Sequence, residues 1–344
     1  MRVLRFLVLL FGSLILAMSF WFQKSIAMAV SILMNDFFLN DLQNGRVNEI
    51  PSRFAIVYMG NEKHFSKYRP GRFSCSNIYD SLRSLGKHFP VNEKGIPDTD
   101  VVILYDGELS NATRQALKEA SPFTVLYHEI VFVDPRDAQW ENETQIDYKR
   151  MIAFWFHYFF ELNFLPDYVM RLDSDSCITS DMVVNPFQYM QTHKIEYMYN
   201  AMFLEPPFVI EGLKDFVRQH PGQPVNKNKA LSLWSKEDSE SMNVFSTNLE
   251  WFYMPAFRRQ HILDWKEEVK QNGGIFRHRW GDAPLRTIVG TTFLNSSRIA
   301  RFCRFSYNHS CWVAFDACVD NTDNHVQEFG WNILYHNGTM SSNQ

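Results

Sequence analysis

The sequence predicts an α/β fold in which helices cover a mostly parallel central sheet. Short apolar runs of strand length alternate with stretches of helix length, an order typical of parallel strand pairing. Apolar residues make up 46% of the 344 residues, which is enough for a large core and excludes a disordered chain. The 34 Lys and Arg against 38 Asp and Glu give a net charge of -4. Such a chain has no basic field for binding a nucleic acid.

The elements of this domain follow one another from residue 53. Strands are expected where short apolar runs occur, at 53–59, 101–105, 123–133 and 168–172. Helices are expected at 75–89, where Ile78, Leu82 and Leu85 share one face, at the polar stretch 111–120 and at the aromatic stretch 147–165. The centre of the last stretch is apolar on nearly all sides but too short to span a bilayer, so we expect a buried helix.

The first residues carry the pattern of a membrane anchor. Two arginines precede an uncharged run from Phe6 to Phe22 (FLVLLFGSLILAMSFWF), close to the roughly 20 residues that cross a bilayer. The positive flank on the amino side directs the rest of the chain to the lumen. A cleaved secretory signal is the alternative, because Ala27-Met28-Ala29 offers a small-x-small site. We expect a cytosolic tail and anchor at 1–24, a stem at 25–52 and the α/β domain at 53–344.

Two further features are typical of the secretory pathway. Acceptor triplets for N-glycosylation begin at Asn111, Asn142, Asn295, Asn308 and Asn337. The five cysteines can form up to two disulfides, and their spacing fits no zinc motif. Their pairing stays open, and Cys177 is expected to be a buried structural cysteine.

The strand expected at 168–172 runs directly into Asp173-Ser174-Asp175. In an open parallel sheet, ligands bind beyond the carboxyl ends of the strands. Two carboxylates at i and i+2 in this place can converge on a divalent cation or on a diphosphate that a cation bridges. The alternative is an ordinary turn in which Asp caps backbone amides.

Motifs of several other enzyme classes are missing from the sequence. No GxGxxG follows the first strand, and GxxxxGK[ST] and GxSxG do not occur. His128-Glu129 has no second histidine at the zincin spacing. Dehydrogenases of the Rossmann type, P-loop kinases, lipases and metalloproteases are therefore disfavoured.

Three blocks between residues 148 and 318 resemble the fungal-type Golgi alpha-1,2-mannosyltransferases. The first is Tyr168-Val169-Met170-Arg171-Leu172-Asp173-Ser174-Asp175 with the downstream Asn185-Pro186-Phe187, and the second is Phe245-Ser246-Thr247-Asn248-Leu249-Glu250. The third and most specific is Gly273-Gly274-Ile275-Phe276-Arg277-His278-Arg279-Trp280-Gly281-Asp282-Ala283-Pro284. A shorter match is Tyr307-Asn308-His309. The resemblance implies a GT-A-like fold behind an amino-terminal anchor, and retaining transfer from GDP-mannose.

The resemblance also implies a metal and nucleotide site. By this likeness Asp173 and His309 would hold Mn2+, a cation that accepts carboxylate oxygen and imidazole nitrogen together. Arg171, Asp175 and Arg279 would contact the nucleotide sugar. A surface histidine in a loop is the alternative for His309.

The catalytic groups implied by the resemblance are two further carboxylates. Glu250 falls at the family's proposed nucleophile, where a carboxylate can attack or stabilise an oxocarbenium-like centre. Asp282 would contact the acceptor sugar. A helix-surface glutamate is the alternative for Glu250, and packing explains Trp280 as well as sugar stacking does.

The sequence thus predicts a lumenal, single-pass type II Golgi enzyme that transfers mannose to a glycan on protein or lipid. One alternative is a transferase of the same fold that uses a UDP-sugar. Another is a catalytically silent, sugar-binding Golgi protein. A glycoside hydrolase is disfavoured, because the two aspartates are adjacent in sequence rather than set across a cleft.

Overall fold

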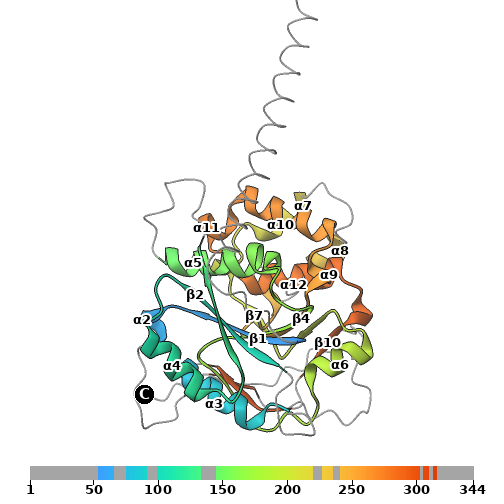
Figure 1. Ribbon diagram of the computed structural model, residues 1–344. Helices are drawn as coiled ribbons and strands as arrows, with labels where there is room; N and C mark the ends of the chain where they lie inside the picture. The colour runs from blue at the N-terminus through green and yellow to red at the C-terminus, as the bar shows by residue number, and fades with distance from the viewer. Residues whose placement is uncertain are drawn as a thin grey trace, which may run out of the picture. The chain divides into compact units, whose positions relative to one another are not determined.

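The fold is built on a seven-stranded sheet with the strand order β10-β6-β9-β4-β1-β2-β3 (Figure 1). Two smaller sheets, β12-β11-β5 and β7-β8, accompany it. The computed structural model describes residues 53–65, 75–90, 99–132, 145–219, 227–234, 241–302, 305–309 and 313–315. The strands are β1 (Phe54–Gly60), β2 (Asp100–Asp106), β3 (Val125–Ile130), β4 (Tyr168–Leu172), β5 (Ser176–Ile178), β6 (Tyr197–Tyr199), β7 (Met202–Glu205), β8 (Met242–Phe245), β9 (Leu249–Tyr253), β10 (Ile299–Arg301), β11 (Tyr307–His309) and β12 (Val313–Phe315).

Helices connect most of these strands. They are α2 (Glu62–Phe65), α3 (Ile78–His88), α4 (Asn111–Ala120), α5 (Ile146–Ala153), α6 (Pro186–His193), α7 (Leu213–Gln219), α8 (Lys227–Leu231), α9 (Met254–Phe257), α10 (Gln260–Asn272), α11 (Gly274–His278) and α12 (Asp282–Phe293). A π-helix, η2 (Phe154–Tyr158), and three short 3-10 helices, η3 (Phe159–Glu161), η4 (Pro207–Val209) and η5 (Ser296–Arg298), complete the set described by the structure. Side chains mark where several helices begin: Ser110, for example, accepts a hydrogen bond from the Thr113 amide at 3.1 Å and so caps α4.

The large sheet is mostly parallel, as the sequence predicts. β1 pairs in parallel with β2 and β4, β2 with β3, and β6 with β10. β9 is the exception, because it runs antiparallel to both β4 and β6. Its register places Glu250 directly opposite Arg171. The sequence analysis expected no strand here, and its alternative of a helix-surface glutamate at Glu250 is wrong.

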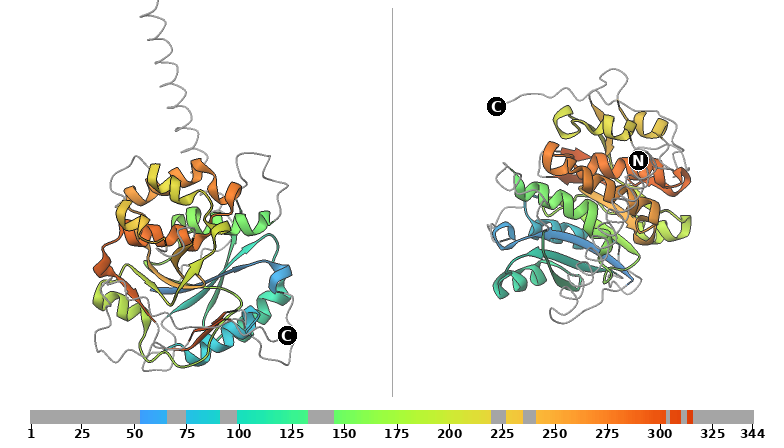
Figure 2. Two further views of the ribbon diagram at one scale, coloured as in Figure 1. Left: turned by 180° about the vertical axis from the view of Figure 1, so that it is seen from behind. Right: turned by 90° about the horizontal axis from the view of Figure 1, so that it is seen from above.

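Two separate apolar cores lie on the two faces of the sheet. Ala55 and Val57 of β1 pack into the core that includes α10 and α12, whereas Ile56 and Tyr58 pack into the core that includes α3 and α4. Figures 1 and 2 show these helix pairs on opposite sides of the strands. Because both faces are covered, the strands read as continuous apolar runs, as is typical of parallel sheets.

Most predicted elements agree with the structure within a few residues. The four predicted strands correspond to β1, β2, β3 and β4, and the first two predicted helices to α3 and α4. The long helix predicted at 147–165 is only partly correct: α5 gives way to the π-helix η2, and helical structure ends at Glu161. Phe154, Trp155 and Phe156 are all buried there, and the wider π turn changes the direction of successive side chains.

The predicted anchor and stem, 1–52, lie outside the described residues, as do Cys303, Cys311 and Cys318. Among the helices that the structure does describe, none has both the length and the apolar character required to cross a bilayer. Cys177 lies on β5 and is fully buried, in agreement with the predicted structural role.

Candidate functional site

The candidate site begins at the carboxyl end of β4, where the chain turns sharply toward β5. The Ser176 amide donates to the Asp173 carbonyl at 3.1 Å and closes this turn. The Asp173 amide donates to the carbonyl of Asn248 at 2.9 Å, which ties the turn to the segment before β9. Burial raises the pKa of the Asp173 carboxyl, although the neighbouring Arg171 opposes the shift.

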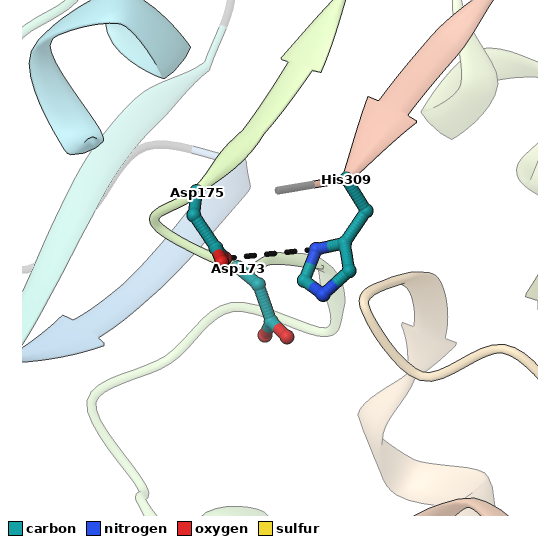
Figure 3. A group of neighbouring side chains, drawn as sticks. All are labelled: Asp173, Asp175 and His309. Atoms are coloured by element: carbon teal, nitrogen blue, oxygen red, sulfur yellow. Dashed lines mark ion pairs between the residues drawn. The ribbon is translucent and has the colours of Figure 1, made fainter. Parts of the chain in front are cut away.

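His309 enters the site from the opposite end of the chain. Strand β11 pairs antiparallel with β5, and His309 lies opposite Ser176. Its Nδ1 is 3.1 Å from Ser176 Oγ and 3.6 Å from Asp175 Oδ1. Figure 3 shows Asp173, Asp175 and His309 gathered around one space, with their ligand atoms within 4.8 Å of one another. The structure thus brings the two expected metal ligands, Asp173 and His309, together with Asp175, which the resemblance assigned to the nucleotide sugar.

Arg171 forms the centre of a buried charge network beside this cluster. Its Nε is 3.2 Å from Asp173 Oδ1, and one terminal nitrogen is 3.2 Å from Glu250 Oε1 and also donates to Asp282. The guanidinium lies 4.3 Å from the centre of the Trp155 ring, a cation–π distance. Burial alone would lower the pKa of Arg171, but the three carboxylates outweigh burial and raise it. Arg171 is therefore a fixed positive charge that joins Asp173 to the other two carboxylates.

Glu250 is fully enclosed within this network. Its side chain is 0% exposed, accepts a hydrogen bond from the Tyr197 hydroxyl at 2.9 Å, and lies 3.4 Å from Arg286 Nε. Burial raises the pKa of Glu250 to about 7, despite the two arginines. Asp282, the first residue of α12, differs, because the charge and hydrogen bond of Arg171 outweigh burial and lower its pKa. The network thus contains two carboxyls with opposite tendencies to hold a proton.

Arg279 and Trp280 lie at one side of the site and play different parts. Arg279 adopts a left-handed backbone (φ 59°), and its guanidinium lies 4.8 Å from the ring of Tyr148 and 5.5 Å from that of Phe208. Trp280 is 1% exposed and donates from Nε1 to the Glu211 carbonyl at 2.6 Å. Trp280 is therefore a buried packing residue. Arg279, in contrast, is only half-buried.

Sequence reasoning did not single out Asn248, Tyr197 or Arg286 as parts of this site. Asn248 Nδ2 donates to Asp173 Oδ2 at 2.9 Å and lies 2.9 Å from His309 Nε2. The sequence did contain a signal for Arg286. It is a charged residue among apolar neighbours in α12, a helix that is buried along most of its length. Tyr197 sits among other aromatic residues and carries no comparable signal.

Comparisons with known proteins were made against families, curated sequences and solved structures. The sequence profile described as glycolipid 2-alpha-mannosyltransferase matches residues 129–325. Alpha-1,2 mannosyltransferase KTR1 of Saccharomyces cerevisiae is 27% identical over 185 residues, which is 52% of this chain and 46% of that protein. The chain thus spans less than half the length of this curated relative.

Two solved structures show the same fold. The S. cerevisiae mannosyltransferase Ktr4p in complex with GDP has a TM-score of 0.65 at 20% identity, covering 79% of this chain and 74% of that one. The Mn/GDP form of core-mannan synthase A from Aspergillus fumigatus has a TM-score of 0.63 at 14% identity, covering 83% of each chain. The predicted GT-A-like fold is supported by both.

Proposed function

This chain belongs to the glycolipid 2-alpha-mannosyltransferase family, and we propose that it transfers mannose from GDP-mannose to a mannose-containing glycan on protein or lipid. The proposed reaction is metal-dependent, retains the anomeric configuration and forms an α-1,2 linkage. The observation that carries the proposal is the convergence of Asp173, Asp175 and His309 beyond the carboxyl end of β4. The relatives crystallised with GDP and with Mn and GDP support the choice of donor and ion.

The donor atoms at this place suit a manganese ion. Asp173 supplies carboxylate oxygen and His309 imidazole nitrogen, a set that Mn2+ accepts. His309 Nε2 lies 2.9 Å from Asn248 Nδ2, the amide nitrogen that also donates to Asp173. Nδ1 lies near Ser176 Oγ and Asp175, and a metal-bound histidine usually directs its second ring nitrogen to such a partner. We assign Asp173 and His309 to hold the ion and Asp175 to orient the imidazole. When bound, the ion offsets the negative charge that develops on the departing diphosphate.

The arginines have distinct proposed roles toward the donor. Arg171 has a side chain only 3% exposed and is engaged with three carboxylates, so its main effect on the nucleotide is through its charge and through holding Asp173. Arg279 is half-buried, and its guanidinium lies near the rings of Tyr148 and Phe208; its Nε is buried and has no hydrogen-bond partner among the described residues. Arg279 is therefore the better candidate for direct contact with a phosphate.

Asp282 and Glu250 remain the proposed catalytic groups, Asp282 in the described arrangement and Glu250 only after a rearrangement. Asp282 has a side chain 9% exposed and is proposed to receive the acceptor hydroxyl. Glu250 is 0% exposed, so direct contact with the sugar requires the side chains that cover it to move. In the described arrangement Glu250 acts through Arg171, to which it gives a fixed position and a compensating charge.

The test is a transfer assay with the full-length chain, Mn2+, a simple mannoside and a panel of nucleotide sugars. We expect transfer from GDP-mannose that EDTA abolishes, with an α-1,2 product identified by mass and NMR. Asp173→Asn should abolish transfer, whereas Asp215→Asn, on the exposed face of α7, should not. Transfer from a UDP-sugar alone would support the first alternative. Glycan binding without transfer from any donor would support the silent sugar-binding protein.

The proposed site of action is the Golgi lumen, with attachment through the run from Phe6 to Phe22. This proposal is supported by the arginines that precede the run and by the N-glycosylation triplets beyond it. Glycosidase treatment should shift the mobility of the protein, and protease added to intact vesicles should leave the domain uncut. Cleavage of the domain under these conditions would contradict the proposed lumenal orientation.

A further inference from the structure

The side-chain amide of Asn248 lies between the two residues proposed to hold the metal. Its Nδ2 is 2.9 Å from Asp173 Oδ2 and 2.9 Å from His309 Nε2. Both contacts are made to residues whose side chains form the candidate metal cluster with Asp175. The amide therefore lies at the edge of the site rather than behind it.

These two distances match the spacing of ligands around one octahedral ion. Metal–ligand bonds of about 2.1 Å at right angles place neighbouring ligand atoms about 3.0 Å apart. An atom that lies 2.9 Å from both Asp173 Oδ2 and His309 Nε2 is thus close enough to both to share one ion with them. We propose that Asn248 is a third protein ligand of the divalent cation and binds it through Oδ1. The inference rests on the proposed metal-dependent transfer.

The amide must turn to serve as a ligand. In the described orientation Nδ2, which has no lone pair to offer, faces Asp173 and His309 and engages the lone pairs that a cation needs. A half-turn about the Cβ–Cγ bond exchanges Nδ2 and Oδ1 and directs the carbonyl oxygen at the ion. Carbonyl oxygens of asparagine are ordinary ligands for hard divalent cations.

Ser246 allows both orientations of the amide. Its Oγ lies 3.2 Å from Asn248 Oδ1 and donates to it. A hydroxyl both donates and accepts, so after the half-turn Ser246 Oγ accepts from Nδ2 instead. The hydroxyl belongs to a residue that is 1% exposed, where an unpaired polar group would be costly. Ser246 therefore keeps its hydrogen bond to the amide in both orientations.

The backbone of this segment is already fixed in place. The Ser246 amide donates to the Ala201 carbonyl at 2.8 Å, and the Asn248 carbonyl accepts from the Asp173 amide at 2.9 Å. The segment from Ser246 to Asn248 is thus held against the loop that carries Asp173. A ligand on such a support needs only a side-chain rotation to bind the ion.

The experiment measures Mn2+ binding to the full-length chain in the presence of GDP, from the electron paramagnetic resonance signal of free Mn2+. Asn248→Ala removes the ligand, and we expect the dissociation constant to rise about tenfold or more. Asn248→Asp keeps an oxygen in place and adds a charge, so we expect a dissociation constant equal to or below that of the wild type. Asn228→Asp, on the exposed part of α8, is the control for added charge and should change nothing.

The sign of the Asn248→Ala effect decides the inference. If Asn248 serves only as a hydrogen-bond donor to its two neighbours, it competes with the cation for their lone pairs, so Asn248→Ala should leave the dissociation constant unchanged or lower it. That result, with the wild type binding Mn2+ and transferring mannose, overturns the inference and leaves the proposed function intact. A wild type that transfers mannose without binding Mn2+ overturns both the inference and the metal dependence. Melting temperatures with and without Mn2+ establish that each variant folds, and Asn248→Asp should gain at least as much from Mn2+ as the wild type.

Discussion

Arg171→Met removes a guanidinium that contacts three carboxylates, those of Asp173, Glu250 and Asp282. Arg171 and Glu250 have side chains that are 3% and 0% exposed, and that of Asp282 is 9% exposed. Methionine keeps an unbranched side chain of similar length that can pack on Trp155. It brings no charge, however, so the carboxylates stay buried with less compensation.

The loss of stability can be estimated from the ion pairs that Arg171 makes. Removing one partner of a buried ion pair costs about 3–5 kcal/mol, because the other charge is left uncompensated. Arg286 remains 3.4 Å from Glu250 and offsets part of this cost. We therefore expect the free energy of unfolding to fall by about 3 kcal/mol and the melting temperature to fall by about 6–12 °C.

Urea unfolding followed by circular dichroism measures the loss. The control is Arg218→Met, which breaks an exposed ion pair with Asp215 at 2.9 Å and should cost less than about 1 kcal/mol. Adding Glu250→Gln to Arg171→Met should recover about 0.5–3 kcal/mol, since it removes an uncompensated charge. A loss no larger than that of the control, or a double variant whose costs simply add, would refute this account of the network.

Three further predictions concern pH dependence, core packing and a helix cap. Because burial raises the pKa of Glu250 from 4.5 to about 7, the folded state holds a proton that the unfolded state releases, and stability falls as pH rises across this range. Glu250→Gln should flatten that slope in urea unfolding at pH 5 to 8, and an unchanged slope would contradict the assignment. Gly274→Ala should cost about 1–3 kcal/mol, because a Cβ there would lie 2.2 Å from Trp280 Cε3, and an unchanged melting temperature would be evidence against the contact. Ser110→Ala should cost about 1 kcal/mol through loss of the cap on the Thr113 amide, measured in the same way, and a gain in stability would count against the cap.

The first four strands of the large sheet were predictable because both faces of the sheet are buried. Runs such as Val101 to Tyr105 are apolar throughout, and only a buried strand or a buried helix can have this composition. The change from apolar Leu172 to charged Asp173 then indicated the carboxyl end of a strand, where ligands bind in parallel sheets. The position of His309 depended on the family resemblance, because nothing in its neighbourhood indicates a partner.

The charge network around Arg171 could not be predicted from local sequence patterns. Arg171 meets Glu250 only because β9 lies antiparallel beside β4, in a register that pairs residues 79 positions apart. A shift of one residue would turn Glu250 to the other face of the sheet. No local pattern fixes that register, so Tyr197 could not be assigned to the site. For Arg286 the sequence indicated a buried charge but not its partner Glu250.

The strand that carries His309 makes this site one of the last parts of the fold to form. Ser176 and Tyr307, whose hydroxyls lie 2.7 Å apart, are 131 positions apart in the chain. Contacts over such separations form slowly, because chain entropy must be lost before they contribute. During synthesis β4 and β9 therefore emerge and can pair while the imidazole is still missing. A divalent cation should bind tightly only after β11 docks, so its affinity would report that folding is complete.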